Sequence, residues 1–333
     1  MVYISIIKYK YKKTGMGVVD NLGAQLEKLI RGASQGSIET KYRYIAAAER
    51  FIKFVGGHFK LKKLQNIQDK HLEAYAAHMK SRGCSDKYIK NDLSGIRYLH
   101  RQIPQARYSI KDSKTANKEM GLGSTPDGRA DRAWTERELS QMKARAVSIG
   151  RYDIARTMEA IRATGMRLDE AASLRRSVVE DALKSGVLHL KNTKGGRPRD
   201  VPLSDRAVAV FNEALKNSPR GGYAFTPAGM KVHVYKKEVE NFIYNHRKEI
   251  QDQERKITGH NLIPGDRGAL TPHGLRHSFG REFIITRFRE SLSSGMIREK
   301  AMDMARKETA EVLGHGRVEV TYIYAPANLL NSE

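Results

Sequence analysis

A polar stretch rich in glycine, serine and aspartate divides this chain of 333 residues. Between about Ile110 and Arg132 the helical periodicity gives way to SKTANKEMGLGSTPDGRAD, a composition typical of linkers. A chain of this length has room for about two domains, each with its own hydrophobic core. We therefore expect a linker at 110–132 between domains at 21–109 and 133–333, with an N-terminal arm at 1–20.

The first domain is predicted to be all-helical. Apolar residues recur at helical spacing from Ser37 to Phe59, from about Asp69 to Lys80 and from Ser85 to Pro104, and a further helix is expected before Ser37. We interpret these apolar stripes as core positions. The start MVYISIIKYKYKK predicts a strand or a loose arm. It is too short to cross a membrane, and its lysines interrupt the apolar run rather than precede it as in a signal peptide.

The charge balance indicates a polyanionic partner. Lys and Arg number 60 against 37 Asp and Glu, a net charge of +23, and the excess recurs in KYKYKK, KLKK, LRRS and KGGRPR. Nucleic acid is the expected partner, although charge alone does not distinguish DNA from RNA. The cations of the helical domain that can meet phosphates, each also compatible with a solvated face, are Lys41, Arg43, Lys53, Lys87, Lys90 and Arg97.

The cysteine content bears on the compartment. A lone Cys84 cannot form an internal disulfide, and it is typical of a buried thiol in a reducing compartment. We expect a cytoplasmic protein with no membrane partner.

The second domain is predicted to be mainly α with a small β-hairpin. Helices are expected at Thr135 to Ser148, Tyr152 to Ala163 and Ser204 to Lys216, and a long charged helix carries Val239 to Ile250. Strands are expected at 187–191 and 199–203, joined by a tight turn at 195–196.

Two arginines and one tyrosine of this domain can act on a phosphodiester. Arg167 lies in ATGMRLDEAASL, Arg276 lies in TPHGLRHSFG, and Tyr324 follows nine residues after the His315 that ends LGH. Planar guanidinium groups each donate two aligned hydrogen bonds to phosphate oxygens. A tyrosine needs a nearby base or cationic surroundings to become a nucleophile at neutral pH. The pattern predicts cleavage of DNA without a metal ion.

Further polar residues accompany this pattern. His273 lies three residues before Arg276, so on a helix both share a face and can touch one phosphate, whereas His277 points elsewhere and suits packing or a supporting role equally well. Lys194, at the hairpin tip in NTKGGRPRDVPL, can protonate a leaving 5′ oxygen. Taken alone, Lys194 is better explained as a solvated turn residue. Three other cations compete for its role: Lys191, Arg197 and Arg199.

A zinc site is the metal-dependent alternative, because His273 and His277 have a spacing that zinc ligands also use. No glutamate lies between them, the sole cysteine is remote, and an arginine beside a zinc ion is electrostatically disfavoured. The acidic residues also form no cluster of the kind that two-metal nucleases need. We expect neither a metal ion nor a cofactor.

Taken together, these segments make the second domain resemble the tyrosine recombinases, or phage-type integrases. TGMRLDEAASL resembles the first arginine box, with Glu170 at its acidic position, and NTKGGRPRDVPL resembles the lysine hairpin. HGLRH and LGH, followed by Tyr324, match the remaining boxes in order and spacing. The helical domain resembles, less specifically, the core-binding domain of the same family, which implies a two-domain clamp around duplex DNA.

The resemblance implies a role for each matching residue. Arg167 and Arg276 would clamp the scissile phosphate, Lys194 would be the general acid, and Tyr324 would form a 3′-phosphotyrosyl link. The residues with assisting roles would be His273 in proton transfer or phosphate binding, His315 in hydrogen bonding to the phosphate, Glu170 in supporting the site, and the looser candidate His277. Tyr322 is a rival nucleophile, two residues early for the family spacing.

The function implied is site-specific DNA recombination or integration by a mobile element. Double-stranded DNA would be the substrate, a homotetramer would form on it during synapsis, and accessory or directionality factors would be further partners. Two alternatives stay open: a non-cleaving accessory protein on the same fold, and a DNA relaxing enzyme of the type IB topoisomerase class. The stretch from Phe288 to Lys307 is longer than usual and predicts an extra helix, and only nine residues follow Tyr324 for exchange between protomers.

Overall fold

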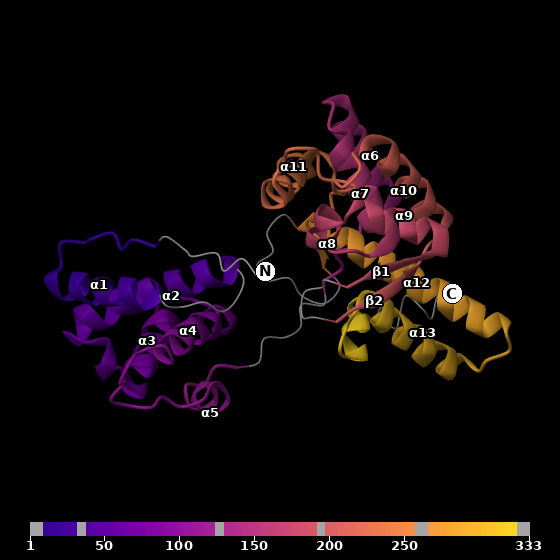
Figure 1. Cartoon of the computed structure of the whole chain (residues 1–333). Coiled ribbons are helices and arrows are strands. Elements are labelled where there is room, and N and C mark those ends of the chain that lie inside the picture. Colours follow the sequence, from indigo (N-terminus) through magenta and orange to yellow (C-terminus); the bar gives the residue numbers. More distant parts are fainter. Residues whose placement is uncertain (1–8, 32–37, 124–129, 192–196, 257–265, 325–333) are drawn as a thin grey trace. The chain divides into compact units, whose positions relative to one another are not determined.

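The computed structural model describes residues 9–31, 38–123, 130–191, 197–256 and 266–324, and the chain forms two compact units, Met1–Pro126 and Asp127–Glu333 (Figure 1). Each unit has its own hydrophobic core, as a chain of this length allows.

The first unit is built from helices. They are α1 (Gly17–Arg31), α2 (Ile38–His58), the short 3-10 helix η1 (Leu64–Asn66), α3 (Asp69–Ser81), α4 (Asp86–His100) and α5 (Ser113–Glu119). The helix expected before Ser37 is therefore present as α1. Helix α2 packs against α1, α3 and α4, and the core between them includes Phe51, Leu72 and Leu93. The apolar stripes of the sequence are confirmed as core positions.

The N-terminal arm is packed onto this unit where it is described. Residues 9–16 contain no strand, so the strand prediction is wrong for them, and residues 1–8 lie outside the described residues. The Tyr9 hydroxyl donates to Glu49 at 2.6 Å, and the backbone N–H of Tyr11 donates to Glu27 at 3.1 Å. Tyr11 is buried in the core. Tyr9 and Tyr11, which belong to the segment predicted as a strand or a loose arm, anchor an irregular stretch of chain on this unit.

The segment expected to be irregular between Ile110 and Arg132 contains a helix, α5. Asp112 caps it, since its carboxylate accepts hydrogen bonds from the backbone N–H groups of Lys114 and Thr115 at 2.7 and 3.1 Å. Lys80 then donates to the carbonyl oxygens of Met120 and Gly121, which hold the end of the segment on α3. The expectation of irregular structure is wrong for 113–119, because a capped helix this short leaves too few apolar positions to show a period.

Two of the cations expected on a solvated face are buried instead. Arg97 is 5% exposed and its three guanidinium nitrogens have no hydrogen-bond partner among the described residues. Arg97 follows the buried Leu93 by one helical turn, which places it on the inner side of α4. Lys41 is also buried, and Lys90 donates to the carbonyl of Gly123 at 2.5 Å. Cys84, expected to be buried, is half-buried at the edge of the core.

The second unit is also mainly helical. Its helices are α6 (Glu136–Ser148), α7 (Tyr152–Thr164), α8 (Leu168–Ser173), α9 (Arg176–Ser185), α10 (Asp205–Asn217), α11 (Val232–Ile250), α12 (Pro272–Ser293), α13 (Arg298–Leu313) and the 3-10 helix η2 (Val318–Ile323). Helix α7 contacts α6, α8, α10 and α12, and small residues such as Ala160 and Ala163 let these neighbours approach it closely. Helices α12 and α13 lie side by side, as Figure 1 shows in orange and yellow.

Two small sheets complete this unit. Strands β1 (Val187–Leu190) and β2 (Arg199–Pro202) pair antiparallel as expected, and β2 packs on α13. The predicted turn at 195–196 falls outside the described residues. The parallel pair β3 (Arg255–Lys256) and β4 (Arg267–Gly268) was not predicted, because two residues are too few to show alternation.

The stretch from Phe288 to Lys307 holds no separate helix. Within the continuous described range 266–324 it is the end of α12 and the start of α13, so the prediction of an extra helix is wrong. Ile284, Phe288, Ala301 and Ala305 form a small core of their own between these two helices. Across the described part of the chain, no helix is both long and apolar enough to cross a membrane.

Candidate active site

Arg276 is a fully buried charge of the second unit, with no exposed surface. It lies in the first turns of α12, after the N-cap Thr271 and Pro272. One terminal nitrogen donates to the carbonyl of Gly165 at 2.5 Å and the other donates to the carbonyl of Leu313. Burial lowers the pKa of Arg276 to about 10. The guanidinium is therefore fixed between the end of α7 and the end of α13, and it stays charged at neutral pH.

The Gly165 contact depends on backbone geometry at the end of α7. Gly165 ends the helix in the left-handed conformation, with φ of 63°. A Cβ at this position would lie 2.4 Å from Cδ1 of Phe279, a distance at which the two carbon atoms would clash. Glycine alone satisfies both the positive φ and the close approach of α12. The glycine of the TGMR segment thus places the carbonyl that orients Arg276.

Arg167 lies immediately after this turn and is held by Glu170. It is the N-cap of α8, and its backbone N–H and its guanidinium donate to the Glu170 carboxylate at 2.7 and 2.8 Å. Arg199, from β2, donates to both oxygens of the same carboxylate at 2.9 and 2.5 Å. Burial acts to raise the pKa of Glu170, but the hydrogen bonds and charge of Arg199, followed by those of Arg167, bring it below its usual value. Glu170 is thus a buried anion shared by two arginines.

Tyr324 and His315 are in direct contact. The Nε2 atom of His315 lies 2.7 Å from the hydroxyl oxygen of Tyr324. His315 lies two residues after the end of α13 and Tyr324 directly follows η2, so the chain between them brings the two rings together. Tyr324 is 2% exposed. This is a hydrogen bond between a phenol and an imidazole at the centre of a cationic site.

The two rings have opposite pKa shifts. Burial raises the pKa of Tyr324, while the nearby guanidiniums of Arg276 and Arg167 act to lower it. Burial lowers the pKa of His315 to about 4, and the charges of Arg276 and Arg167 add to that effect. At neutral pH the imidazole is therefore uncharged and the phenol is protonated. An uncharged imidazole bonded to a phenol can accept its proton.

The ring of His277 lies between the rings of His273 and Tyr324. Its ring centroid is 4.9 Å from that of His273 and 4.8 Å from that of Tyr324, both in edge-to-face contact. His277 is buried, and burial holds its pKa well below the usual value. The ring of His277 packs on Tyr324, which agrees with the packing role, one of the two expected for this residue. His273 is exposed and Arg276 is buried, and the charges of both act to lower the pKa of His315. That His273 and Arg276 touch one phosphate stays a prediction.

The rival nucleophile and one rival of the proposed general acid are both engaged elsewhere. Tyr322 is 51% exposed, and the guanidinium carbon of Arg306 lies 3.9 Å from its ring centroid. Lys194 lies outside the described residues. Of its three rivals, Arg199 is committed to Glu170, so as a salt-bridged guanidinium it is a poor proton donor.

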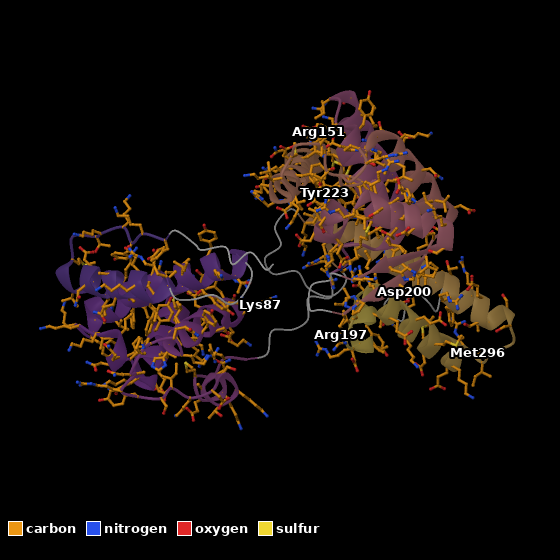
Figure 2. All side chains as sticks on the ribbon, viewed as in Figure 1. Lys87, Arg151, Arg197, Asp200, Tyr223 and Met296 are labelled. Carbon is orange, nitrogen blue, oxygen red and sulfur yellow. The ribbon has the colours of Figure 1, made fainter. Side chains whose placement is uncertain are left out.

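A cavity of about 570 Å³ opens beside His315, between the two strands and the end of α13. Arg197, Arg199 and Gly314 line it together with His315. Figure 2 labels Arg197, two residues before β2, and Asp200, within β2. Among the residues that the structure describes, no group of three or more histidine, cysteine or acidic side chains is placed to hold a metal ion.

Two residues of this site were missed or misassigned from the sequence. Arg199 lies two residues before the buried Val201 on β2, so both side chains face the same, inner side of the strand. This spacing is a signal in the sequence for an inward-facing arginine. Arg281 follows His277 by four residues, so both lie on one face of α12, and its Nε donates to the backbone carbonyl of Tyr324 at 3.1 Å.

Comparisons with known proteins identify a family and a fold. The Phage integrase family matches residues 135–286, and the phage integrase N-terminal SAM-like domain matches residues 25–110. Tyrosine recombinase XerD of Staphylococcus saprophyticus is 26% identical over 311 residues, which cover 90% of each chain. The solved Tn1549 transposon integrase in complex with a circular intermediate DNA has a TM-score of 0.54 at 17% identity, over 95% of this chain and 98% of that one. A lambda integrase tetramer bound to a Holliday junction gives a TM-score of 0.54 at 15% identity, over 94% and 81%.

Proposed function

Since this chain belongs to the phage integrase family, and is a site-specific tyrosine recombinase, we propose that Tyr324 is the nucleophile that cuts DNA. The single observation that carries this assignment is the 2.7 Å contact between the Tyr324 hydroxyl and an uncharged His315. Tyr322, the rival, is exposed and stacked by Arg306. A buried phenol with a base and two guanidiniums around it is the better nucleophile.

The proposed step is a transesterification. The phenolic oxygen of Tyr324 attacks the phosphorus, a bond from phosphorus to that oxygen forms, and the bond to the 5′ oxygen breaks. The phenolic proton passes to Nε2 of His315, a role that the Tyr324 contact suggests in addition to the phosphate hydrogen bond implied by the resemblance. The departing 5′ oxygen takes a proton from Lys194. The products are a 3′-phosphotyrosyl ester and a 5′ hydroxyl. A 5′ hydroxyl of a partner strand then attacks the ester, rejoins the strand and frees the tyrosine, so the exchange requires no metal ion or cofactor.

Arg276 and Arg167 would stabilise the charge that develops on the phosphate. A guanidinium has five N–H donors, and two of those of Arg276 are used on the Gly165 and Leu313 carbonyls. The Nε–H of Arg276 has no partner among the described residues and is available to a phosphate oxygen. Because both terminal nitrogens are already anchored, the group loses little freedom when it binds the transition state.

The other site residues would act around this centre. Glu170 supports Arg167 and is itself held by Arg199, which keeps the first arginine in place without DNA. His273, exposed at the start of α12, would assist proton transfer or bind the phosphate, and His277 would support the ring of Tyr324 by packing.

Double-stranded DNA is the proposed substrate and partner. Two observations support this proposal: the net charge of +23, and the presence of DNA in the solved structures of the similar Tn1549 and lambda integrases. We further propose that 21–109 is a core-binding domain, 133–333 a catalytic domain and 110–132 their linker. A homotetramer during synapsis follows from the likeness to the lambda integrase tetramer, and accessory or directionality factors are further proposed partners. As its substrate is DNA, we propose action in the cytoplasm of a prokaryotic cell.

A suicide-substrate assay tests the function. The purified chain is incubated with a nicked duplex that carries its target site, in the presence of a chelator, and the products are separated under denaturing conditions. A covalent protein–DNA complex with the wild type, absent with Tyr324→Phe, is the expected result. No complex with the wild type would instead support a non-cleaving accessory protein on the same fold. Recombination of paired sites, rather than relaxation of supercoiled DNA alone, separates this enzyme from the type IB topoisomerase class.

A further inference from the structure

One arginine of α12 touches both the proposed nucleophile and the place where the chain enters the second unit. Nε of Arg281 donates to the backbone carbonyl of Tyr324 at 3.1 Å, and its Nη2 donates to the Asp131 carboxylate at 2.7 Å. The two side chains are about three-quarters buried, since 25% of Arg281 and 27% of Asp131 is exposed. The guanidinium therefore spans a gap between two segments 193 positions apart in the sequence.

The entry segment, defined as residues 130–134, is itself fixed by several backbone contacts. The backbone N–H of Asp131 donates to the carbonyl of Asp266, and its own carbonyl accepts from Gly268, both at 2.8 Å. The Asp131 carboxylate also accepts from the backbone N–H of Ala133 at 2.9 Å. Asp131 is thus oriented on three sides before Arg281 contributes a fourth contact.

The same segment crosses the first turns of α12, which carry His273, Arg276 and His277. The backbone N–H of Trp134 donates to the Ser278 hydroxyl at 2.7 Å, and its indole N–H donates to the carbonyl of Thr271 at 3.0 Å. A Cβ at Gly274 would lie 2.4 Å from the carbonyl oxygen of Arg132, so backbone meets backbone there. Any displacement of the entry segment must therefore move α12 or break these contacts.

We propose that Arg281 is a positioning residue that aligns Tyr324 and makes this alignment depend on the path of the entry segment. It does not touch the reacting atoms, because its contact is with the carbonyl of Tyr324 rather than with the phenol. A planar guanidinium holds several N–H donors in fixed directions, so it can bond two acceptors that lie at different angles. The compact ammonium group of a lysine does not offer this fixed arrangement of donors. The consequence is that the entry segment controls how well the nucleophile is presented. This inference rests on the proposed role of Tyr324.

The test separates DNA binding from strand cleavage in the full-length chain. Variants Arg281→Ala and Arg281→Lys are compared with the wild type for affinity to an intact target duplex and for the single-turnover rate of covalent complex formation on the nicked duplex. We expect the affinity to stay within about twofold and the cleavage rate to fall by about 10- to 100-fold, the effect of a misplacement near one ångström. Lysine should not restore the rate, because it cannot serve both acceptors.

Asp131→Ala supplies the second measurement. It should slow cleavage less than Arg281→Ala does, and it should add nothing when combined with Arg281→Ala, because both changes break the same link. The control is Arg287→Ala, which removes another ion-paired, partly exposed arginine from α12, one bonded to Glu290 and Glu308. Its cleavage rate should equal that of the wild type.

Three results would overturn the inference: a cleavage rate for Arg281→Ala that equals the wild type, a fall that only matches lost binding or lost folded protein, or fully additive effects of Asp131→Ala and Arg281→Ala. The folded fraction is measured by thermal denaturation of each variant. If the wild type itself forms no covalent complex, the proposed function fails, which is a different outcome from a normal rate in the Arg281 variants.

Discussion

The Nε2 atom of His315 and the hydroxyl oxygen of Tyr324 lie 2.7 Å apart, with the imidazole uncharged at neutral pH. The contact joins the end of α13 to the end of η2 and lies beside the guanidinium of Arg276. A base and a nucleophile are thus paired before any substrate arrives. Burial raises the pKa of Tyr324, and the guanidiniums of Arg276 and Arg167 act against that effect.

The first prediction concerns the pH dependence of His315. Its pKa is lowered to about 4, first by burial and then by Arg276 and Arg167. Since the folded pKa is below the unfolded one, the unfolded state binds more protons between these two values, and stability must fall as the pH is lowered through that range. A titration followed by NMR should show the His315 ring neutral down to about pH 4. His315→Gln should reduce the loss of stability between mildly acid pH and pH 4. A ring that titrates at an ordinary histidine pKa would contradict this.

The second prediction concerns the buried carboxylate. Arg199→Met removes two hydrogen bonds from Glu170 and leaves that anion with Arg167 alone. Breaking one side of a buried ion pair costs about 3–5 kcal/mol, and we expect a loss near the lower end because Arg167 remains. Chemical denaturation measures the free energy of unfolding. Lys216→Met, which removes an exposed pair with Glu213, should change it by less than about 1 kcal/mol. Equal effects would argue against a structural role for Arg199.

The third prediction concerns Gly165. Gly165→Ala forces an alanine into a positive φ and brings its Cβ within 2.4 Å of Phe279. The backbone strain alone costs about 1–3 kcal/mol, and the displaced carbonyl should also loosen Arg276 and slow cleavage. The matched control is Gly150→Ala, which has φ of 75° but nothing within 4 Å of the new Cβ. The control should show the strain in denaturation without the loss of cleavage; if both variants cleave DNA equally, the Gly165 carbonyl does not orient Arg276.

The sequence was enough to predict the helices whose apolar residues repeat at helical spacing, namely α2, α3, α4, α6, α7, α10 and α11. It also predicted the β1–β2 pair. It did not predict α5, whose seven residues carry one buried alanine, or the two-residue strands β3 and β4. A short element is fixed by its caps and tertiary contacts, which leave no period in the sequence.

For the site too, the sequence predicted which residues take part but not the contacts that they make. Spacing on a helix and motif order identified Arg167, Arg276, His315 and Tyr324 as candidates, since each lies in a short segment of unusual composition. The direction of each side chain was harder to predict: Arg97 was expected to meet phosphates or to lie on a solvated face and is buried, and Arg199 was expected at the hairpin and faces Glu170. The links of Arg199 to Glu170 and of Arg281 to Asp131 join residues far apart in the chain. Such pairings depend on tertiary packing, which one sequence does not reveal.

The most direct test of the account is to identify the residue that becomes attached to DNA. The covalent complex formed on the nicked duplex is digested with protease and nuclease, and the modified peptide is sequenced by mass spectrometry. We expect a nucleotide linked through its 3′ phosphate to Tyr324. Attachment at Tyr322, or a complex that persists unchanged in Tyr324→Phe, would contradict it.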